Sequence, residues 1–183
     1  MEFNLLIFNL MLCGFFAITS FAEEQKKFKF ILDNVITEKE SEDVGKIKVE
    51  LDKSGDYLKI NGEAEQLVDL DNTWKVQIVL KGANEANEEF KERLTLPLLG
   101  VCDFMKFYYK MYIYESLVKY ANAPAPNVCP VVKDTYVLRD YPLVSEKFQK
   151  FLQPGFYRME ASLYHEEEEK IKYSVEGHVV EEE

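Results

Sequence analysis

Apolar and polar residues alternate with a period of two along most of this chain. Because successive side chains of a strand point to opposite faces, such alternation predicts strands with one buried face. The pattern occurs in seven segments, which are 28–32, 46–51, 58–60, 74–81, 136–138, 157–163 and 171–179. We expect a mainly β protein, an immunoglobulin-like β-sandwich of seven to nine antiparallel strands.

Charged segments separate some of these predicted strands. Residues 157–163 and 171–179 form the clearest hairpin, and Glu166 to Glu169 lie between them. Four adjacent carboxylates repel one another, so we expect a solvated loop tip there. The charged stretch from Thr37 to Asp43 has the same interpretation.

One segment, Phe104 to Ala121, departs from the alternation. Its apolar residues follow helical spacing, and they cover more surface than a single packed face requires. The prolines at 124 and 126 end the helix, because proline lacks the backbone donor and restricts its predecessor. We predict one helix inserted after Cys102. A strand remains the alternative, since Tyr and Ile favour sheets.

The first 22 residues have the features of a signal peptide. Leu5 to Phe16 form an apolar core, and Ser20 and Ala22 are small residues at the positions that a signal peptidase reads. We expect cleavage before Glu23, secretion to the extracellular space, and a single domain over residues 23–183. No Lys or Arg precedes the apolar core, which leaves a retained signal anchor as the alternative. No later segment approaches the roughly 20 apolar residues that a membrane span needs.

Cysteine usage agrees with secretion. Cys13 lies in the predicted signal peptide, so Cys102 and Cys129 are the two cysteines of the mature chain. In an oxidising compartment we expect them to form a disulfide. By the chain-entropy estimate, closing a loop of this length contributes about 3–4 kcal/mol.

The charge of the chain restricts its partners. It has 22 basic and 33 acidic residues, a formal net charge of −11. Nucleic acid needs a basic face, so we expect no nucleic-acid partner. The net charge also argues against electrostatic adhesion to anionic membranes.

Catalytic chemistry finds little support in the sequence. The two histidines, His165 and His178, lie at opposite ends of the predicted C-terminal hairpin, too far apart to share a metal or a triad. Nucleophile-elbow, zinc-binding and phosphate-cradling motifs are missing. We therefore expect no enzyme activity, no cofactor and no metal site.

Several motifs occur in an order that resembles a known family. They are Cys102, the aromatic helix, Asn122-Ala-Pro, Cys129-Pro130, residues 135–138 and residues 154–158. The chain resembles insect secreted proteins of the group that includes the CheA and CheB chemosensory proteins. That group is considered similar to the lipid-recognition domain shared by the ganglioside activator protein and the endotoxin coreceptor. The resemblance implies a sandwich whose two sheets part to admit lipid. Lys133-Asp134 stands where the family usually has a glycine, and one disulfide replaces several in the vertebrate carriers, so a looser cavity or none is the alternative.

Four helix residues are the candidate ligand contacts: Phe104, Phe107, Tyr108 and Met111. On composition alone they would be core, like Trp74, which begins a regular strand; the resemblance makes them equally candidates for lining an apolar cavity. We expect a secreted, non-enzymatic carrier that binds a lipid or hydrophobic semiochemical between the sheets. The alternative is a fully packed extracellular module that binds a receptor or another secreted protein.

Overall fold

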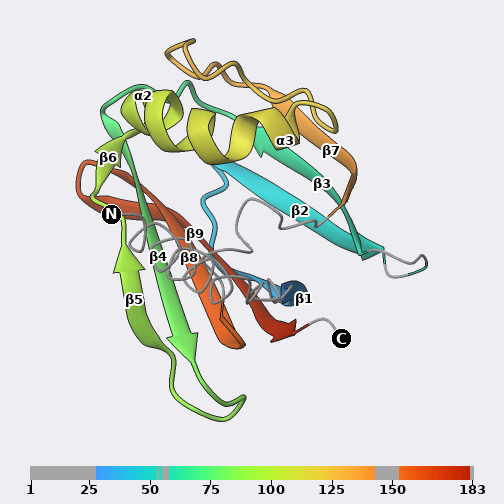
Figure 1. Ribbon diagram of the computed structural model, residues 1–183. Coiled ribbons are helices and arrows are strands. Elements are labelled where there is room, and N and C mark those ends of the chain that lie inside the picture. Colours follow the sequence, from blue (N-terminus) through green and yellow to red (C-terminus); the bar gives the residue numbers. More distant parts are fainter. Residues whose placement is uncertain (1–27, 53, 55–57, 143–152, 182–183) are drawn as a thin grey trace, which may run out of the picture.

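A computed structural model describes residues 28–52, 54, 58–142 and 153–181. Over these ranges the chain forms nine strands in two antiparallel sheets and one continuous helical segment (Figure 1). The predicted mainly β class, the strand number and the helix after Cys102 are confirmed. The predicted signal peptide, residues 1–22, lies outside the described residues.

The large sheet contains most of the predicted strands. Its order is β1-β9-β8-β4-β5, and β6 pairs with β4 beside β5. The strands are β1 (Phe28–Lys39), β4 (Trp74–Ala83), β5 (Lys91–Thr95), β6 (Leu99–Gly100), β8 (Gly155–His165) and β9 (Glu168–Glu181). The alternation did not predict β5 and β6, because both are short and β5 is mostly polar.

The small sheet has the order β2-β3-β7. Its strands are β2 (Gly45–Asp52), β3 (Lys59–Gln66) and β7 (Thr135–Pro142). Ile47 lies opposite Ala64, which in turn lies opposite Tyr136, so these three side chains share one face. The other face carries charged pairs such as Lys46 with Glu65, 2.9 Å apart. One face is therefore directed to the interior and the other to solvent.

The helix runs along the end of the molecule at the top of Figure 1. It comprises α2 (Val101–Phe104), the π-helical η1 (Met105–Tyr114) and α3 (Glu115–Leu117). Near its start, the backbone N–H of Asp103 donates to Oδ1 of Asn72 at 3.3 Å. Because the first N–H groups of a helix lack partners within the helix, this contact from the β3–β4 connection helps to anchor it.

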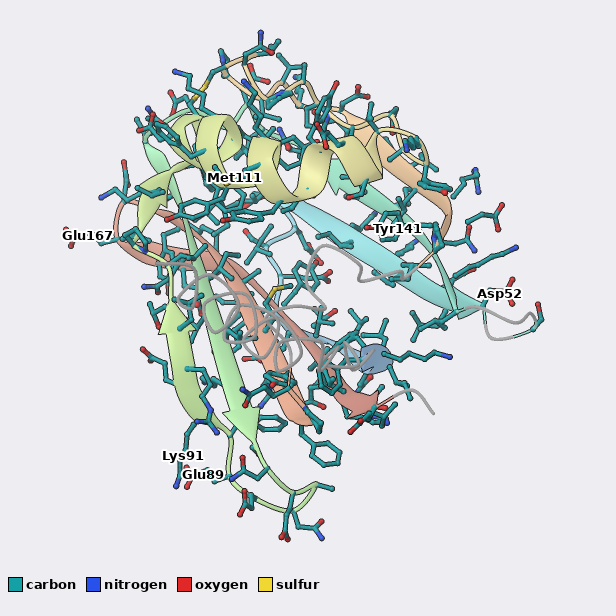
Figure 2. The ribbon with its side chains drawn as sticks, in the orientation of Figure 1. Asp52, Glu89, Lys91, Met111, Tyr141 and Glu167 are labelled. Atoms are coloured by element: carbon teal, nitrogen blue, oxygen red, sulfur yellow. A yellow bond between two sulfur atoms is a disulfide. The ribbon has the colours of Figure 1, made fainter. Side chains whose placement is uncertain are left out.

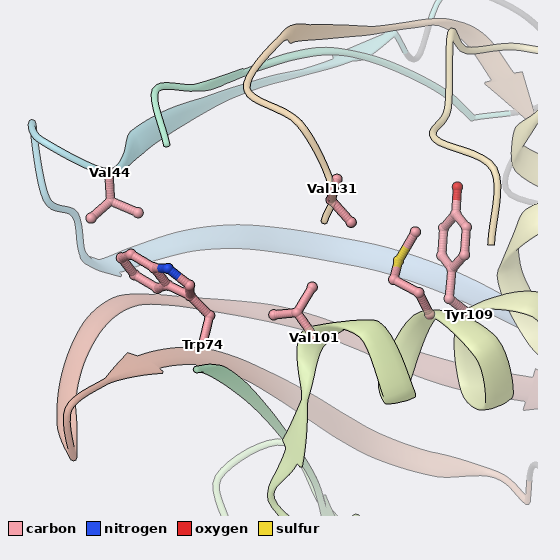
Figure 3. Close-up of a cluster of buried hydrophobic side chains, with 6 residues drawn as sticks. Val44, Trp74, Val101, Tyr109 and Val131 are labelled. Atoms are coloured by element: carbon pink, nitrogen blue, oxygen red, sulfur yellow. The ribbon is translucent and has the colours of Figure 1, made fainter. Parts of the chain in front are cut away.

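The main apolar core lies between the helix and the first residue of β4 in the large sheet. Its six buried members are Val44, Trp74, Val101, Met105, Tyr109 and Val131 (Figure 3). Leu163 and Ile171 from the large sheet and Tyr136 from the small sheet pack against them. The core therefore joins the helix to both sheets. Trp74 is 9% exposed, which confirms its predicted core position.

Charged side chains cover the opposite face of the large sheet. Two register shifts in β1 leave Asp33 and Glu38 outside the regular pairing with β9. Such bulges re-aim side chains, and both acids contact basic groups. Asp33 lies 2.8 Å from the His178 ring, and Glu38 lies 3.1 Å from Lys172.

Two expectations about loops need correction. The tip of the last hairpin contains only Glu166 and Glu167, which are exposed and have positive φ angles, because β9 begins at Glu168. The half-buried carboxylate of Glu169 instead accepts hydrogen bonds from Ser162 and Tyr164. The second expectation placed a loop from Thr37 to Asp43, but β1 continues to Lys39, so the loop begins three residues later, at Glu40.

Candidate functional site

The interior face of the small sheet presents apolar side chains that are not fully covered. Ile47 and Val49 are 39% and 37% exposed. They share this face with Tyr136, which packs against the core. The exposure therefore falls on the side of the sheet that faces the helix and the large sheet, where a closely packed sandwich would bury both residues.

The large sheet shows the same property on its interior face. Met159 and Leu94 are 42% and 54% exposed. Leu80 lies opposite both residues, and the same face of β4 carries the core residue Trp74. Apolar side chains with incomplete cover thus occur on the interior faces of both sheets.

The helix brings two of the predicted ligand residues together. Phe104 and Tyr108 are half-buried, and their ring centroids lie 6.1 Å apart. Tyr112 continues the row, 6.4 Å from Tyr108. Phe104 also packs against the core. This row therefore extends from the core along the helix.

The other two predicted residues lie at the surface. Phe107 is 61% exposed and Met111 is 63% exposed, and Figure 2 shows Met111 beside the helix. None of the four predicted residues lines either of two surface cavities, which measure about 500 Å³ and 470 Å³. The larger is lined by polar residues such as Lys75 and Glu167, and the smaller lies beside the β4–β5 connection. The role of the four residues in ligand binding stays a prediction.

The buried side of the helix consists of residues that the sequence interpretation passed over. Met105 and Tyr109 are each 6% exposed, and the Tyr109 ring lies 5.7 Å from that of Tyr114. The Tyr109 hydroxyl donates to the Pro124 carbonyl at 3.0 Å, and burial raises the pKa of Tyr109 to about 12. The spacing of four from Val101 through Met105 to Tyr109 was the available signal. Phe107 and Met111 have the same spacing, so spacing alone did not choose between the two rows.

The predicted disulfide between Cys102 and Cys129 is confirmed, with Cα atoms 5.7 Å apart. It joins the first turn of the helix to the connection that leads to β7. Together with the hydrogen bond from Tyr109 to Pro124, it attaches this connection to the helix at two places.

In the part of the chain that the structure describes, the two histidines lie at opposite ends of the last hairpin. His165 pairs with Glu168 at the tip of the β8–β9 hairpin, whereas His178 pairs with Phe156 at the far end. No cluster of three or more His, Cys, Asp or Glu side chains in this part has a metal-binding arrangement. Its helical segments also fall short of the length and apolarity required to cross a bilayer.

Comparison with known families gives one match. Residues 76–159 match the sequence model of a family described as a protein of unknown function, DUF1091. The matched region runs from β4 into β8 and includes the helix, both cysteines and the connection between them. A comparison with curated proteins found no match.

Proposed function

We propose that this protein is a secreted, non-enzymatic carrier that binds an apolar ligand, such as a lipid or hydrophobic semiochemical, between its two sheets. The observation that carries the proposal is the incomplete cover of interior-facing apolar side chains on both sheets. Ile47 and Val49 belong to the small sheet, and Met159 and Leu94 belong to the large one. Buried apolar surface contributes about 25 cal/mol per Å², so leaving such residues open forgoes stability that a ligand can recover.

The helix supplies the third side of the proposed ligand site. Phe104 and Tyr108 are half-buried and continue from the core, which suits them to contact an acyl chain. Phe107 and Met111 then belong to the exposed rim of the site. Methionine adapts to irregular apolar shapes, and tyrosine combines an apolar ring with a polar tip.

The disulfide and the resemblance to a known family support the same proposal. A disulfide fits an oxidising, extracellular compartment. The likeness of the chain to chemosensory and lipid-recognition proteins rests on ordered motifs. The family match at residues 76–159 includes those motifs but assigns no function. The competing proposal is an interaction module for another secreted protein, which the exposed apolar residues also suit.

Two measurements test the carrier. Native mass spectrometry of the protein purified from its source should detect a bound lipid, and the emptied protein should bind a fluorescent fatty acid. Val49→Asp and Met159→Asp each place a charge on an interior face and should weaken probe binding by more than about tenfold. Val180→Asp is the matched control, because Val180 is 36% exposed and its neighbour Val179 is the residue directed inward.

A lack of lipid binding would overturn the carrier proposal. If no lipid copurifies and the wild-type protein binds no fatty-acid probe, the interaction module is the better description. Thermal unfolding of each variant must accompany the binding data, so that a loss of affinity is not confused with a loss of folding.

A further inference from the structure

Exposed apolar side chains concentrate in one part of the chain. Among the described residues, fourteen large hydrophobic side chains are exposed, and seven of them lie between Phe107 and Val132. This stretch begins within η1 and includes the rest of the helix and most of the connection to β7, which lie at the upper end of the molecule in Figure 1. One end of the protein is therefore much more apolar than the rest of its surface.

The same stretch has the opposite charge to the whole chain. It contains Lys110, Lys119 and a single acidic residue, Glu115, which gives a formal charge of +1 in a chain of −11, and Lys106 and Lys133 lie directly before and after it. In contrast, Figure 2 shows the acidic residues Asp52, Glu89 and Glu167 at other extremities of the molecule. The negative net charge of the whole chain therefore does not describe the charge of this end of the molecule.

Lysines and exposed apolar residues alternate on the helix itself. Lys106 precedes Phe107, Lys110 precedes Met111, and each pair is separated from the other by one turn. All four side chains are exposed, and the exposed Tyr112 follows them. We call these five residues the helix surface. The disulfide and the bond from Tyr109 to Pro124 hold the helix against its connection, so this surface is rigidly presented.

We propose that the helix surface is a contact site for lipid bilayers with anionic headgroups. In such a contact Phe107 and Met111 enter the boundary between headgroups and acyl chains, while Lys106 and Lys110 pair with headgroup phosphates or carboxylates. Tyrosine rings favour the same boundary, because one end is apolar and the other is polar. The pattern fits a bilayer better than a protein partner, since lysine is depleted in protein–protein interfaces.

The proposal goes beyond the carrier function and does not depend on it. A protein that carries no ligand between its sheets would still have this apolar and basic end. If the carrier proposal is also correct, the rim residues Phe107 and Met111 bring the ligand site close to a membrane that supplies or receives lipid.

Vesicle flotation with the full secreted chain tests the contact. We expect binding to phosphatidylcholine vesicles that contain about 30% phosphatidylserine, and much weaker binding to phosphatidylcholine alone. Raising the NaCl concentration from about 0.05 M to about 0.5 M should release the protein, because salt screens exposed charges. Lys106→Gln with Lys110→Gln should weaken binding by about 25-fold, from roughly fivefold for each lysine near the surface.

Two further variants separate this surface from its surroundings. Phe107→Ser with Met111→Ser should reduce binding at least as strongly, through loss of apolar insertion. Leu67→Ser with Lys48→Gln is the matched control, because these residues are an exposed apolar side chain and an exposed lysine elsewhere in the molecule, and it should bind like wild type. The interior variant Val49→Asp should also retain vesicle binding, which distinguishes this test from that of the carrier.

Three results would overturn the proposal: no binding of wild type to anionic vesicles at low salt, equal binding to neutral vesicles, or unchanged binding of the lysine variant. The serine variant alone is not decisive if it fails to fold, but the lysine variant changes only exposed side chains. If the helix surface binds an acidic protein and this chain binds no vesicles, the surface is a protein interface instead.

Discussion

The imidazole ring of His165 stacks on the indole ring of Trp74, with their centroids 4.2 Å apart and their planes inclined by 20°. The two residues lie opposite each other where β8 ends and β4 begins. Trp74 is the single tryptophan of the chain and belongs to the buried core. His165, which lies too far from His178 to share a metal or a triad with it, thus contacts the main core.

Replacing His165 should therefore disturb the core and its tryptophan. We expect His165→Ala to lower the free energy of unfolding by about 1 kcal/mol, the scale of an aromatic pair beyond its burial. It should also shift the tryptophan emission to longer wavelength, because solvent gains access to the indole ring. Denaturant unfolding followed by fluorescence measures both effects. His178→Ala, at the other end of the hairpin, should leave the emission maximum unchanged.

The disulfide gives a second prediction. Cys102→Ser should lower the free energy of unfolding by about 2–5 kcal/mol, as is typical of small secreted domains. The cross-link joins the helix, whose residues form half of the main core, to the connection that carries Val131. Thermal unfolding with and without reductant measures the loss, and peptide mapping without reduction should recover one linked pair. Two freely alkylated thiols in the protein purified from its source would contradict the prediction.

The charged face of the large sheet gives a third prediction. Lys172 lies 3.1 Å from both Glu38 and Glu160, and all three side chains are less than 30% exposed. Lys172→Met should cost about 2 kcal/mol, between the values for a surface ion pair and a buried one. Lys46→Met is the matched control, because the pair of Lys46 with Glu65 is well exposed and its loss should cost less than about 1 kcal/mol.

The same network makes the effect of Lys172→Met depend on pH. The pKa of Glu38 lies below the usual 4.5, chiefly because Ser174 donates a hydrogen bond to its carboxylate, and Lys172 adds to the effect. Burial raises the pKa of Glu160, but hydrogen bonds from Lys81 and Lys172 outweigh burial and lower it. A carboxyl with a lowered pKa stabilises the folded state above its unfolded value, and this stability is lost as pH falls through the folded value. The difference between wild type and Lys172→Met should therefore be full at neutral pH and shrink below about pH 4.5; a difference that grows with acid would contradict the network.

The hairpin tip gives a fourth prediction. Glu166 and Glu167 have φ angles of 50° and 67°, a conformation that glycine adopts without steric cost. Glu167→Gly should therefore raise the free energy of unfolding by about 1 kcal/mol. Glu169→Ala should lower it by about 1–2 kcal/mol, because the buried hydroxyl of Ser162 loses its acceptor. If Glu167→Gly and Glu169→Ala changed the free energy of unfolding equally, the proposed difference between the strained tip and the hydrogen-bonded strand would be wrong.

Local patterns were sufficient for much of the fold. The alternation around Ile47 and around Met159 identified strands and correctly assigned their apolar faces to the interior. The proline-rich exit indicated a helix that ends before Pro124, although the helix ends at Leu117, four residues before the expected Ala121. Counting cysteines identified the disulfide. In contrast, β5 carries only Leu94 as a large apolar residue, so its pairing with β4 depends on the neighbouring strand and left no periodic signal.

The sequence also predicted only part of the candidate site. The sequence by itself determined that the helix is rich in aromatic residues and that its apolar surface exceeds one packed face. Only the tertiary structure decided that Met105 and Tyr109 are buried while Phe107 and Met111 are exposed. Both rows repeat every four residues, so the choice depends on which row meets Trp74 and Val131, residues that are distant in sequence. Periodicity reports which side chains share a face, whereas burial depends on the surface that packs against that face.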